Sequence, residues 1–500
     1  MTDAVPDRAP IEHAQRFFIG GSWVPPSSDS KINVISASTE KIYMTVAEAQ
    51  EADIQRAVSA ARTAFDEGPW PRMTHAERAG YVREIGQGIV ARWADIADIW
   101  SNEMGIVRSF SGVLGPFVRS IYDYYASLAD TFAFEERHVI MQGVGLHVRE
   151  PVGVVAAIVP WNAPPLLTAQ KVAPALLAGC TIVLKASPEA PGSIHVLAEI
   201  IKEVGLPDGV FNFVTADRQV SELLVRHPGI DKVTFTGSIT AGKKIASICG
   251  ERIARCTLEL GGKSAAVILD DYDLATAAQS LAASTEHMTG QVCAALTRVI
   301  VTRKRHDQLV EALASSFSAI KVGDPFDAAT QMGPLAMSRQ RDRVEGYIAR
   351  GKAEGATLAA GGGRPPRLKR GYYIEPTIFG RVDNNMTIAR EEIFGPVLSV
   401  IPVDNEAQAV DVANDSVFGL SAAVFTNDPD RAYWAARQLR SGTVGHNGAK
   451  GDLTIGFGGF KQSGIGREGG VNGLLPFLES KTVLLEGEPT HLKPTHSKPS

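Results

Sequence analysis

The chain has 500 residues, of which 44% are hydrophobic and 21% are charged, and its formal net charge is −5. This length exceeds the size at which a single hydrophobic core stops growing, so two or more domains are expected, and the composition excludes a disordered or fibrous protein. The weak negative charge offers no electrostatic reason to bind nucleic acid or an anionic membrane, which leaves small neutral or weakly charged molecules as the expected partners.

Four cysteines, Cys180, Cys249, Cys256 and Cys293, are too few to cross-link a chain of this length. Reduced thiols and a cytoplasmic location are therefore expected. The longest apolar stretches, 152–159 and 172–184, are too short or contain a proline, so neither a transmembrane span nor an export sequence is predicted. The polar, proline-containing segments 1–16 and 487–500 are predicted to be mobile.

The first third of the chain is predicted to be mostly helical. Apolar residues recur at helical spacing over 53–65, and Thr74-His75-Ala76-Glu77 is typical of a capping box that begins a helix extending to Trp93. Residues 107–130 form a further helical region. Residues 137–149 alternate like an antiparallel ribbon, and 481–485 are predicted to be a short terminal strand.

From Glu150 onward, short β-rich runs alternate with helical segments, which predicts parallel, doubly wound sheets. The first block has strands at 152–159, 181–184, 210–214 and 232–236. The second block, from Ala265 to about Gly442, has strands at 266–269, 298–302 and 397–402. We therefore expect two α/β domains with a cleft between them.

A cysteine and a glutamate predict covalent chemistry. Cys293 lies in Gly-Gln-Val-Cys-Ala-Ala and Glu259 in Leu-Glu-Leu-Gly-Gly-Lys-Ser. A cysteine attacks a carbonyl carbon as the thiolate, so its site has to lower the thiol pKa from about 8.5. Apolar neighbours would desolvate Glu259 and raise its pKa, which suits a general base that activates water. The other three cysteines lack such a context and are predicted to be core residues.

These two stretches closely resemble those of the NAD(P)-dependent aldehyde dehydrogenase superfamily, and the resemblance extends over roughly residues 18 to 485. It implies a Rossmann-like NAD(P)-binding domain, a catalytic domain and a small β oligomerisation arm, and assembly as a homodimer or homotetramer. The implied boundaries are 17–130 and 151–259 for the cofactor domain, 131–150 and 478–486 for the arm, and 260–477 for the catalytic domain.

A phosphate-binding turn is predicted after the strand 232–236. The chain has no Gly-x-Gly-x-x-Gly after a strand, but Gly237 and Ser238 open a helix, whose free N–H groups can receive a pyrophosphate. Taken alone, this is an ordinary helix cap. Its place between Lys185 and Glu259 makes it resemble the phosphate-binding turn of the family.

The resemblance also implies roles for further residues. Asn162 would donate its amide to the oxyanion together with the Cys293 N–H, and losing one such donor costs about 3 to 4 kcal/mol in the transition state. The cofactor-binding positions implied are Val159, Trp161, Lys185, Glu189, Gly237, Ser238, Gly242, Leu260, Glu392 and Phe394. No metal site is predicted, because His195, His287 and His446 lack the spacing of metal ligands.

NAD is the expected cofactor, with NADP possible. Pro188 stands where a glutamate is common in the family, but Glu189 is one position further on, and no arginine adjoins Lys185 in the sequence to receive a 2′-phosphate.

The sequence therefore predicts an aldehyde dehydrogenase that acts through a thiohemiacetal and a thioester and releases the acid with water. Two alternatives are a CoA-acylating semialdehyde dehydrogenase, which generally lacks the glutamate present here as Glu259, and a catalytically silent binding protein. Ala163, Leu167 and Gln170 follow Asn162 where some relatives carry aromatic residues. They indicate a roomier aliphatic tunnel and a medium or long, branched or cyclic aldehyde.

Overall fold

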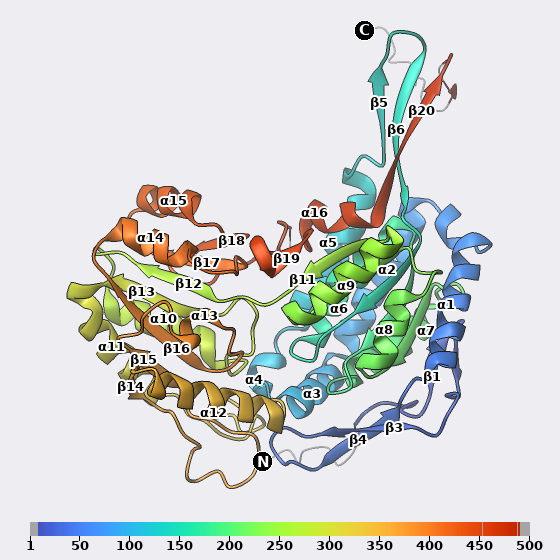
Figure 1. Cartoon of the computed structure of the whole chain (residues 1–500). Helices are drawn as coiled ribbons and strands as arrows, with labels where there is room; N and C mark the ends of the chain where they lie inside the picture. Colours follow the sequence, from blue (N-terminus) through green and yellow to red (C-terminus); the bar gives the residue numbers. More distant parts are fainter. Residues whose placement is uncertain (1–8, 453, 488, 491–500) are drawn as a thin grey trace.

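The computed structural model describes residues 9–452, 454–487 and 489–490 (Figure 1). Two α/β domains lie side by side, and a three-stranded arm projects from one of them (Figure 1). This architecture confirms the predicted fold class. No helix within the described ranges is long and apolar enough to cross a membrane.

The first domain is built on an eight-stranded sheet in the order β19-β11-β10-β7-β8-β9-β1-β2. Its five central strands are parallel. The two edges are antiparallel, because β1 pairs with β9 and β19 pairs with β11. The strand bounds are β1 (Phe17–Ile19), β2 (Ser22–Val24), β7 (Val154–Ile158), β8 (Thr181–Ala186), β9 (Phe211–Thr215), β10 (Lys232–Thr236), β11 (Arg255–Glu259) and β19 (Gly464–Ile465).

Helices cover both faces of this sheet because its buried strands are apolar on both sides. In β7, Val155 and Ala157 face one cluster, while Val154, Ala156 and Ile158 face the other. The first face packs against α2 (His75–Ala91), α3 (Trp93–Met104), α5 (Gly115–Thr131), α6 (Pro164–Ala178) and α7 (Gly192–Val204). The second packs against α1 (Glu51–Asp66), α8 (Arg218–Arg226) and α9 (Ile239–Arg252).

The predicted helices are present, but two of the predicted helical regions are interrupted. The capping box is present, since Thr74 Oγ1 accepts from the Glu77 N–H at 3.2 Å and Glu77 accepts from the Thr74 N–H at 2.7 Å. The helix expected to run to Trp93 ends at Ala91, and α3 begins at Trp93. The region 107–130 divides into α4 (Arg108–Ser111) and α5.

The second domain contains a seven-stranded sheet in the order β14-β15-β16-β13-β12-β17-β18, parallel except for β14. Its strands are β12 (Ser264–Ile268), β13 (Leu296–Thr302), β14 (Thr357–Ala360), β15 (Thr377–Gly380), β16 (Val397–Val403), β17 (Ser421–Phe425) and β18 (Thr443–His446). Its helices are α10 (Leu274–Glu286), α11 (Arg303–Ser318), α12 (Ser338–Ala353), α13 (Thr387–Arg390), α14 (Glu406–Asn414) and α15 (Pro429–Gln438).

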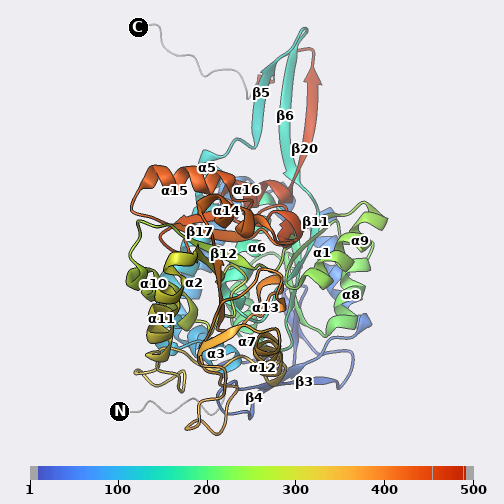
Figure 2. The same cartoon turned by 60° about the vertical axis from the view of Figure 1, so that its left-hand side comes forward.

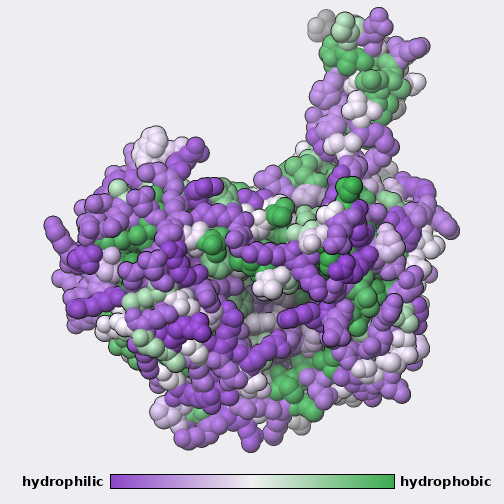
Figure 3. All heavy atoms as spheres, in the orientation of Figure 1, coloured by the Kyte–Doolittle hydropathy of each residue, from purple (hydrophilic) through white to green (hydrophobic). Residues whose placement is uncertain are grey.

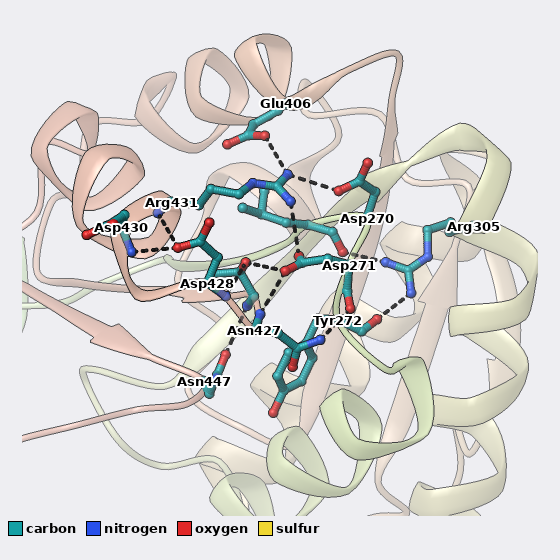
Figure 4. A network of polar contacts seen from close by, with 12 residues as sticks. Asp270, Asp271, Tyr272, Arg305, Glu406, Asn427, Asp428, Asp430, Arg431 and Asn447 are labelled. Atoms are coloured by element: carbon teal, nitrogen blue, oxygen red, sulfur yellow. Dashed lines mark hydrogen bonds and ion pairs between the residues drawn. The ribbon is translucent and has the colours of Figure 1, made fainter.

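A network of polar contacts joins loops at the carboxyl edge of this second sheet (Figure 4). Arg431 contacts three carboxylates, Asp270 and Glu406 at 2.9 Å and Asp271 at 3.4 Å. Asp271 also accepts from the Asn427 N–H at 2.9 Å. These contacts connect the loop after β12 to the loop after β17.

The arm is an antiparallel sheet of β20 (Leu478–Leu485), β6 (Val144–Pro151) and β5 (Glu135–Val139), and it stands clear of both domains in the two ribbon views (Figures 1 and 2). The ribbon and the terminal strand predicted from alternation are thus both present. Apolar side chains gather near the tip of the arm (Figure 3), where Val139, Met141 and Leu484 are exposed.

Two features near the N-terminus differ from the sequence predictions. The N-terminal strands β1 to β4 were not predicted, and β3 (Lys31–Ile35) pairs with β4 (Ile42–Ala47) as a separate hairpin. Residues 9–16 were expected to belong to a mobile terminus, yet Ala9 and Ile11 are buried and the Glu12 N–H donates to Glu199 at 2.8 Å. Residues 1–8, and most of the predicted tail 487–500, lie outside the described residues.

The expected catalytic segment 260–477 is also interrupted. From Gly464 the chain returns to the first domain, where β19 pairs with β11 and Leu474 and Phe477 join its core. This segment comprises β19, α16 (Gly470–Leu474) and the 3-10 turn Leu475–Phe477, and a further 3-10 turn, Lys461–Ser463, precedes it. This return of the chain depends on the pairing of β19 with the edge of the first sheet, and no local sequence pattern predicts that pairing.

Candidate active site

The predicted site residues lie where the carboxyl edge of the first sheet meets the amino edge of the second. Asn162 follows β7, Gly237 follows β10, and Glu259 ends β11. Cys293 lies in the turn between α10 and β13, and Phe394 precedes β16. Because strands of a parallel sheet share one carboxyl edge, residues from distant motifs converge at this boundary.

A cavity of about 450 Å³ occupies this boundary and brings most of the predicted residues together. Its wall includes eight of them: Trp161, Asn162, Gly237, Ser238, Leu260, Cys293, Glu392 and Phe394. Val159, Lys185, Glu189, Gly242 and Glu259 do not line it. The thiol expected to react with the substrate and six of the ten residues expected to hold a cofactor thus line one cavity.

Asn162 is held in place by two hydrogen bonds. Its Nδ2 donates to the Gln291 carbonyl at 3.0 Å, and its own carbonyl accepts from Trp100 Nε1 at 2.9 Å. Gln291 is two residues before Cys293, so the bond fixes the amide beside the nucleophile. An amide nitrogen has two hydrogens, which leaves one to donate to an oxyanion.

Glycines allow the close backbone packing around Cys293. Gly290 has φ +67°, and a side chain there would collide with the backbone of Gly395. A side chain at Gly262 would collide with the Cys293 carbonyl. The two glycines therefore let the turn that carries Cys293 pack directly against the backbone of the neighbouring segments.

The electrostatics of Cys293 differ from the sequence expectation of a lowered pKa. Burial, followed by the charges of Glu392 and Glu259, raises the pKa of the Cys293 thiol to about 12. A lowered pKa was expected because the reaction requires a thiolate. The fold, however, places two carboxylates near the thiol, and their negative charges raise its pKa. At neutral pH the free protein therefore holds a protonated thiol, and activation requires a positive charge or a base.

We expect alkylation of Cys293 by iodoacetamide to be slow at pH 7 and to rise about tenfold per pH unit up to pH 10, because only the thiolate reacts. Glu392→Gln removes a negative charge, so it should lower the thiol pKa and speed alkylation at pH 8 by roughly tenfold. Peptide mass spectrometry would follow the label, with Cys256→Ala as the control. A wild-type rate that levels off below pH 8 would contradict the raised pKa.

Glu259 is buried, and both of its carboxylate oxygens lack a hydrogen-bond partner among the described residues. Burial, followed by the charge of Glu468, raises its pKa well above the ordinary value. This agrees with the raised pKa expected of a general base. A buried carboxylate without a partner is costly, which indicates a group that the fold keeps available for chemistry.

Behind Glu259 lies a buried ion pair that the sequence did not reveal. Lys171 Nζ, on α6, donates to Glu468 and to Thr236 Oγ1, the latter at 2.7 Å. Lys171 and Glu468 are both buried, and they are 297 positions apart in the chain. No local pattern could pair residues so far apart.

The N-terminus of α9 forms the expected turn. The Gly237 N–H donates to the Glu259 carbonyl at 3.0 Å, and Ser238 Oγ caps the helix by accepting from the Ala241 N–H at 3.3 Å. A side chain at Gly237 would meet the Phe235 ring at 2.5 Å. Gly242, predicted to contact the cofactor, allows close packing of α9 against Leu260.

Lys185 and Glu189 lie near each other at the end of β8. Burial lowers the pKa of Lys185 to about 8, against the raising effects of Glu189 and Asp217. Burial would raise the pKa of Glu189, but hydrogen bonds from Ser187 and Arg339 lower it overall. Val159 is buried, and its N–H donates to the Lys185 carbonyl at 3.2 Å, so it positions this strand end.

Arg339 corrects the expectation that no arginine adjoins this site. It comes from α12 and forms an ion pair with Glu189. Arg339 and Arg343 are four positions apart and therefore share a helix face, and with Gln340 they line the cavity. The spacing is visible in the sequence, but only the tertiary structure shows which face meets the cavity.

Glu392 and Phe394 form the wall opposite α9. Glu392 accepts from the Gly262 N–H at 3.0 Å, and burial raises its pKa to about 7. Phe394 has φ +64°, and its ring centroid is 5.4 Å from that of Trp161 at an interplanar angle of 89°. Gln340 Nε2 donates to the Phe394 carbonyl at 2.5 Å and holds this strained loop.

The residue set fits a dinucleotide. It combines a helix N-terminus, a buried lysine beside a carboxylate, and a cavity next to the thiol that is lined by Trp161, Phe394 and Glu392. Helix N-termini bind phosphate groups, and a carboxylate binds ribose hydroxyls.

Comparisons with known proteins agree with this geometry. Residues 23–483 match the model of the aldehyde dehydrogenase family. Geranial dehydrogenase of Castellaniella defragrans is 44% identical over 479 residues, covering 95% of this chain and all of that protein.

Two solved structures have the same fold. An aldehyde dehydrogenase of Mycobacterium tuberculosis, complexed with NAD+, is 44% identical with a TM-score of 0.92, covering 94% of this chain and 98% of that one. A mutant of aldehyde dehydrogenase C of Pseudomonas syringae, complexed with NAD+ and octanal, is 38% identical with a TM-score of 0.92, covering 96% and 98%. The chain therefore belongs to the aldehyde dehydrogenase family.

Proposed function

We propose that the protein oxidises a medium or long, aliphatic, branched or cyclic aldehyde to its carboxylic acid with NAD+, through a thioester on Cys293. The observation that carries this proposal is the single cavity that Cys293 shares with Asn162, the N-terminus of α9 and Glu392. Lys185, Glu189, Ser238 and Glu392 would hold the cofactor. Bound NAD+ would supply a hydride acceptor and a positive charge near the thiol.

In the proposed first half-reaction, the Cys293 thiol gives its proton to water, the sulfur forms a bond to the aldehyde carbon, and the carbonyl oxygen becomes an oxyanion. The second Asn162 Nδ2 hydrogen and the Cys293 N–H donate to this oxygen. Loss of hydride from the same carbon then leaves a thioester on Cys293. The Gln291 contact that fixes Asn162 supports this role.

In the second half-reaction, Glu259 accepts a proton from water as the water oxygen attacks the thioester carbon. The carbon–sulfur bond breaks, and the acid leaves while Cys293 is restored. The unpartnered, buried carboxylate of Glu259 supports its role as base, because a raised pKa increases the affinity of the carboxylate for a proton. Glu468 raises the pKa of Glu259 further, while Lys171, the ion-pair partner of Glu468, opposes that effect.

The proposed substrate class rests on partly buried residues close to Asn162 and Cys293 in the sequence, which would line the path of the aldehyde. Leu166 and Leu167 begin α6 just after Asn162, and Met288 precedes Cys293; all three are partly buried. The Phe110 and His287 rings stack with centroids 4.2 Å apart. The names of the relatives that act on geranial or bind octanal agree with such a lining.

A panel of acetaldehyde, octanal, terpenoid and aromatic aldehydes, each mixed with protein and NAD+, tests the proposal through NADH absorbance. We expect the highest kcat/KM for octanal-length or terpenoid aldehydes. Preference for acetaldehyde would contradict the substrate class, and no turnover of any aldehyde would contradict the activity.

We expect NAD+ to be preferred over NADP+, because the Glu189 carboxylate would repel a 2′-phosphate. Glu189→Gln removes this charge and releases Arg339, an arginine that can bind phosphate. The ratio of kcat/KM for NADP+ to that for NAD+ should rise by roughly tenfold or more. Arg339→Gln is the matched control, and in the double variant the gain should disappear. A wild-type preference for NADP+ would contradict the assignment.

We also propose that the arm joins copies of the chain into a homodimer or homotetramer. The support is its separation from both domains and its exposed apolar residues Val139, Met141 and Leu484. Light scattering after size-exclusion chromatography distinguishes these two states, and a monomer would contradict both. The cytoplasmic location stays a prediction.

A further inference from the structure

Three potential metal ligands lie together on the arm, away from the cavity. Glu136 and His138 are two positions apart on β5, so their side chains project from the same face of the strand. His147, on β6, pairs directly with Glu136 in the antiparallel ladder. One ligand atom from each residue lies within 4.8 Å of the others.

We propose that Glu136, His138 and His147 bind one Zn²⁺ ion. Zinc takes histidine nitrogens at about 2.0–2.1 Å and carboxylate oxygens at about 2.0–2.2 Å, commonly with three protein ligands and a water. Directly opposed residues in an antiparallel ladder have Cβ atoms only about 4.5–5.5 Å apart, so side-chain rotations can close the remaining gap without moving the strands.

The surroundings of Glu136 are compatible with this role. Its Oε1 forms an ion pair with Arg149 at 2.6 Å, and a carboxylate has a second oxygen for a metal. Such a contact orients a ligating carboxylate, although the arginine charge weakens the attraction for a cation. The His138 and His147 rings are 6.3 Å apart between centroids and tilted by 54°, so they converge without stacking.

The position of the site gives it a structural consequence. β5 forms the edge of the three-stranded arm, and an ion held by Glu136, His138 and His147 would join that edge to the central strand β6. None of the three residues lines the catalytic cavity. The site therefore concerns the stability of the arm rather than the oxidation of substrate.

The test is a zinc titration of the full-length, tag-free protein after removal of metals with EDTA. It is made by isothermal titration calorimetry in a Cys256→Ala, Cys293→Ala background, because both thiols are partly exposed and an exposed thiol also binds zinc. We expect about one Zn²⁺ per chain, with affinity reduced roughly 100-fold by His138→Ala or His147→Ala and about tenfold by Glu136→Gln. His13→Ala, which removes a partly exposed histidine elsewhere, is the matched control and should bind like the parent.

Co²⁺ provides a second readout, since its visible spectrum reports the ligand set. The parent should give the absorption of a low-coordinate histidine site, and His138→Ala and His147→Ala should not. Circular dichroism would confirm that the variants are folded, and with Cys293 restored their aldehyde oxidation should be unchanged. Equal zinc affinity in His138→Ala and the parent, or no binding at 100-fold molar excess of zinc, would overturn the proposal.

Discussion

Cys293→Ala should abolish aldehyde oxidation, lowering kcat by roughly 10⁴-fold or more, because no other group can form the covalent intermediate. Of the remaining cysteines, Cys180 and Cys249 are buried in the cores and Cys256 lies on β11 at the far end from the cavity. Steady-state NADH formation with the best aldehyde of the panel measures the loss.

Cofactor binding should survive this change, since the cavity wall is otherwise intact. A titration with NAD+ should give a Kd within about threefold of the wild type, well under the tenfold that 1.4 kcal/mol represents. Cys256→Ala is the matched control, because it removes a partly exposed thiol outside the cavity and should leave kcat unchanged. Turnover by Cys293→Ala within tenfold of the wild type would refute the covalent mechanism.

Glu259→Gln should separate the two half-reactions. The substitution keeps the size of the side chain but removes the base, so the thioester should form and then hydrolyse very slowly. Rapid mixing with NAD+ and aldehyde should show a burst of NADH approaching one per active site, followed by steady turnover reduced by roughly 10²- to 10⁴-fold.

Loss of the burst as well would show that Glu259 acts earlier, by taking the proton from Cys293. The raised pKa of the thiol makes this outcome informative, since that proton must leave before the carbon–sulfur bond forms. Glu468→Gln provides a related control, because it removes the neighbouring charge that raises the Glu259 pKa while retaining the base. We expect it to keep the burst and to shift the pH dependence of turnover to lower pH.

The sequence by itself determined the fold class and predicted which groups react. Apolar runs such as 152–159, followed by a helical segment, predict parallel strands because only a strand buried on both faces is apolar throughout. Cys293 and Glu259 were predicted from their own short stretches of sequence, and the role of Asn162 was implied by the resemblance of those stretches to the aldehyde dehydrogenase superfamily. Apolar runs and short motifs consist of residues that are neighbours in the chain, and so they can be read from the sequence alone.

The tertiary structure alone decided which distant groups meet and what charge they carry. Arg339 reaches Glu189, and Lys171 reaches Glu468, through contacts between elements far apart in the chain. The pKa of Cys293 is raised because folding removes water from the thiol and brings Glu392 and Glu259 near it. Burial and electrostatic interaction depend on distances in space, which the order of residues does not specify until the two sheets are packed edge to edge.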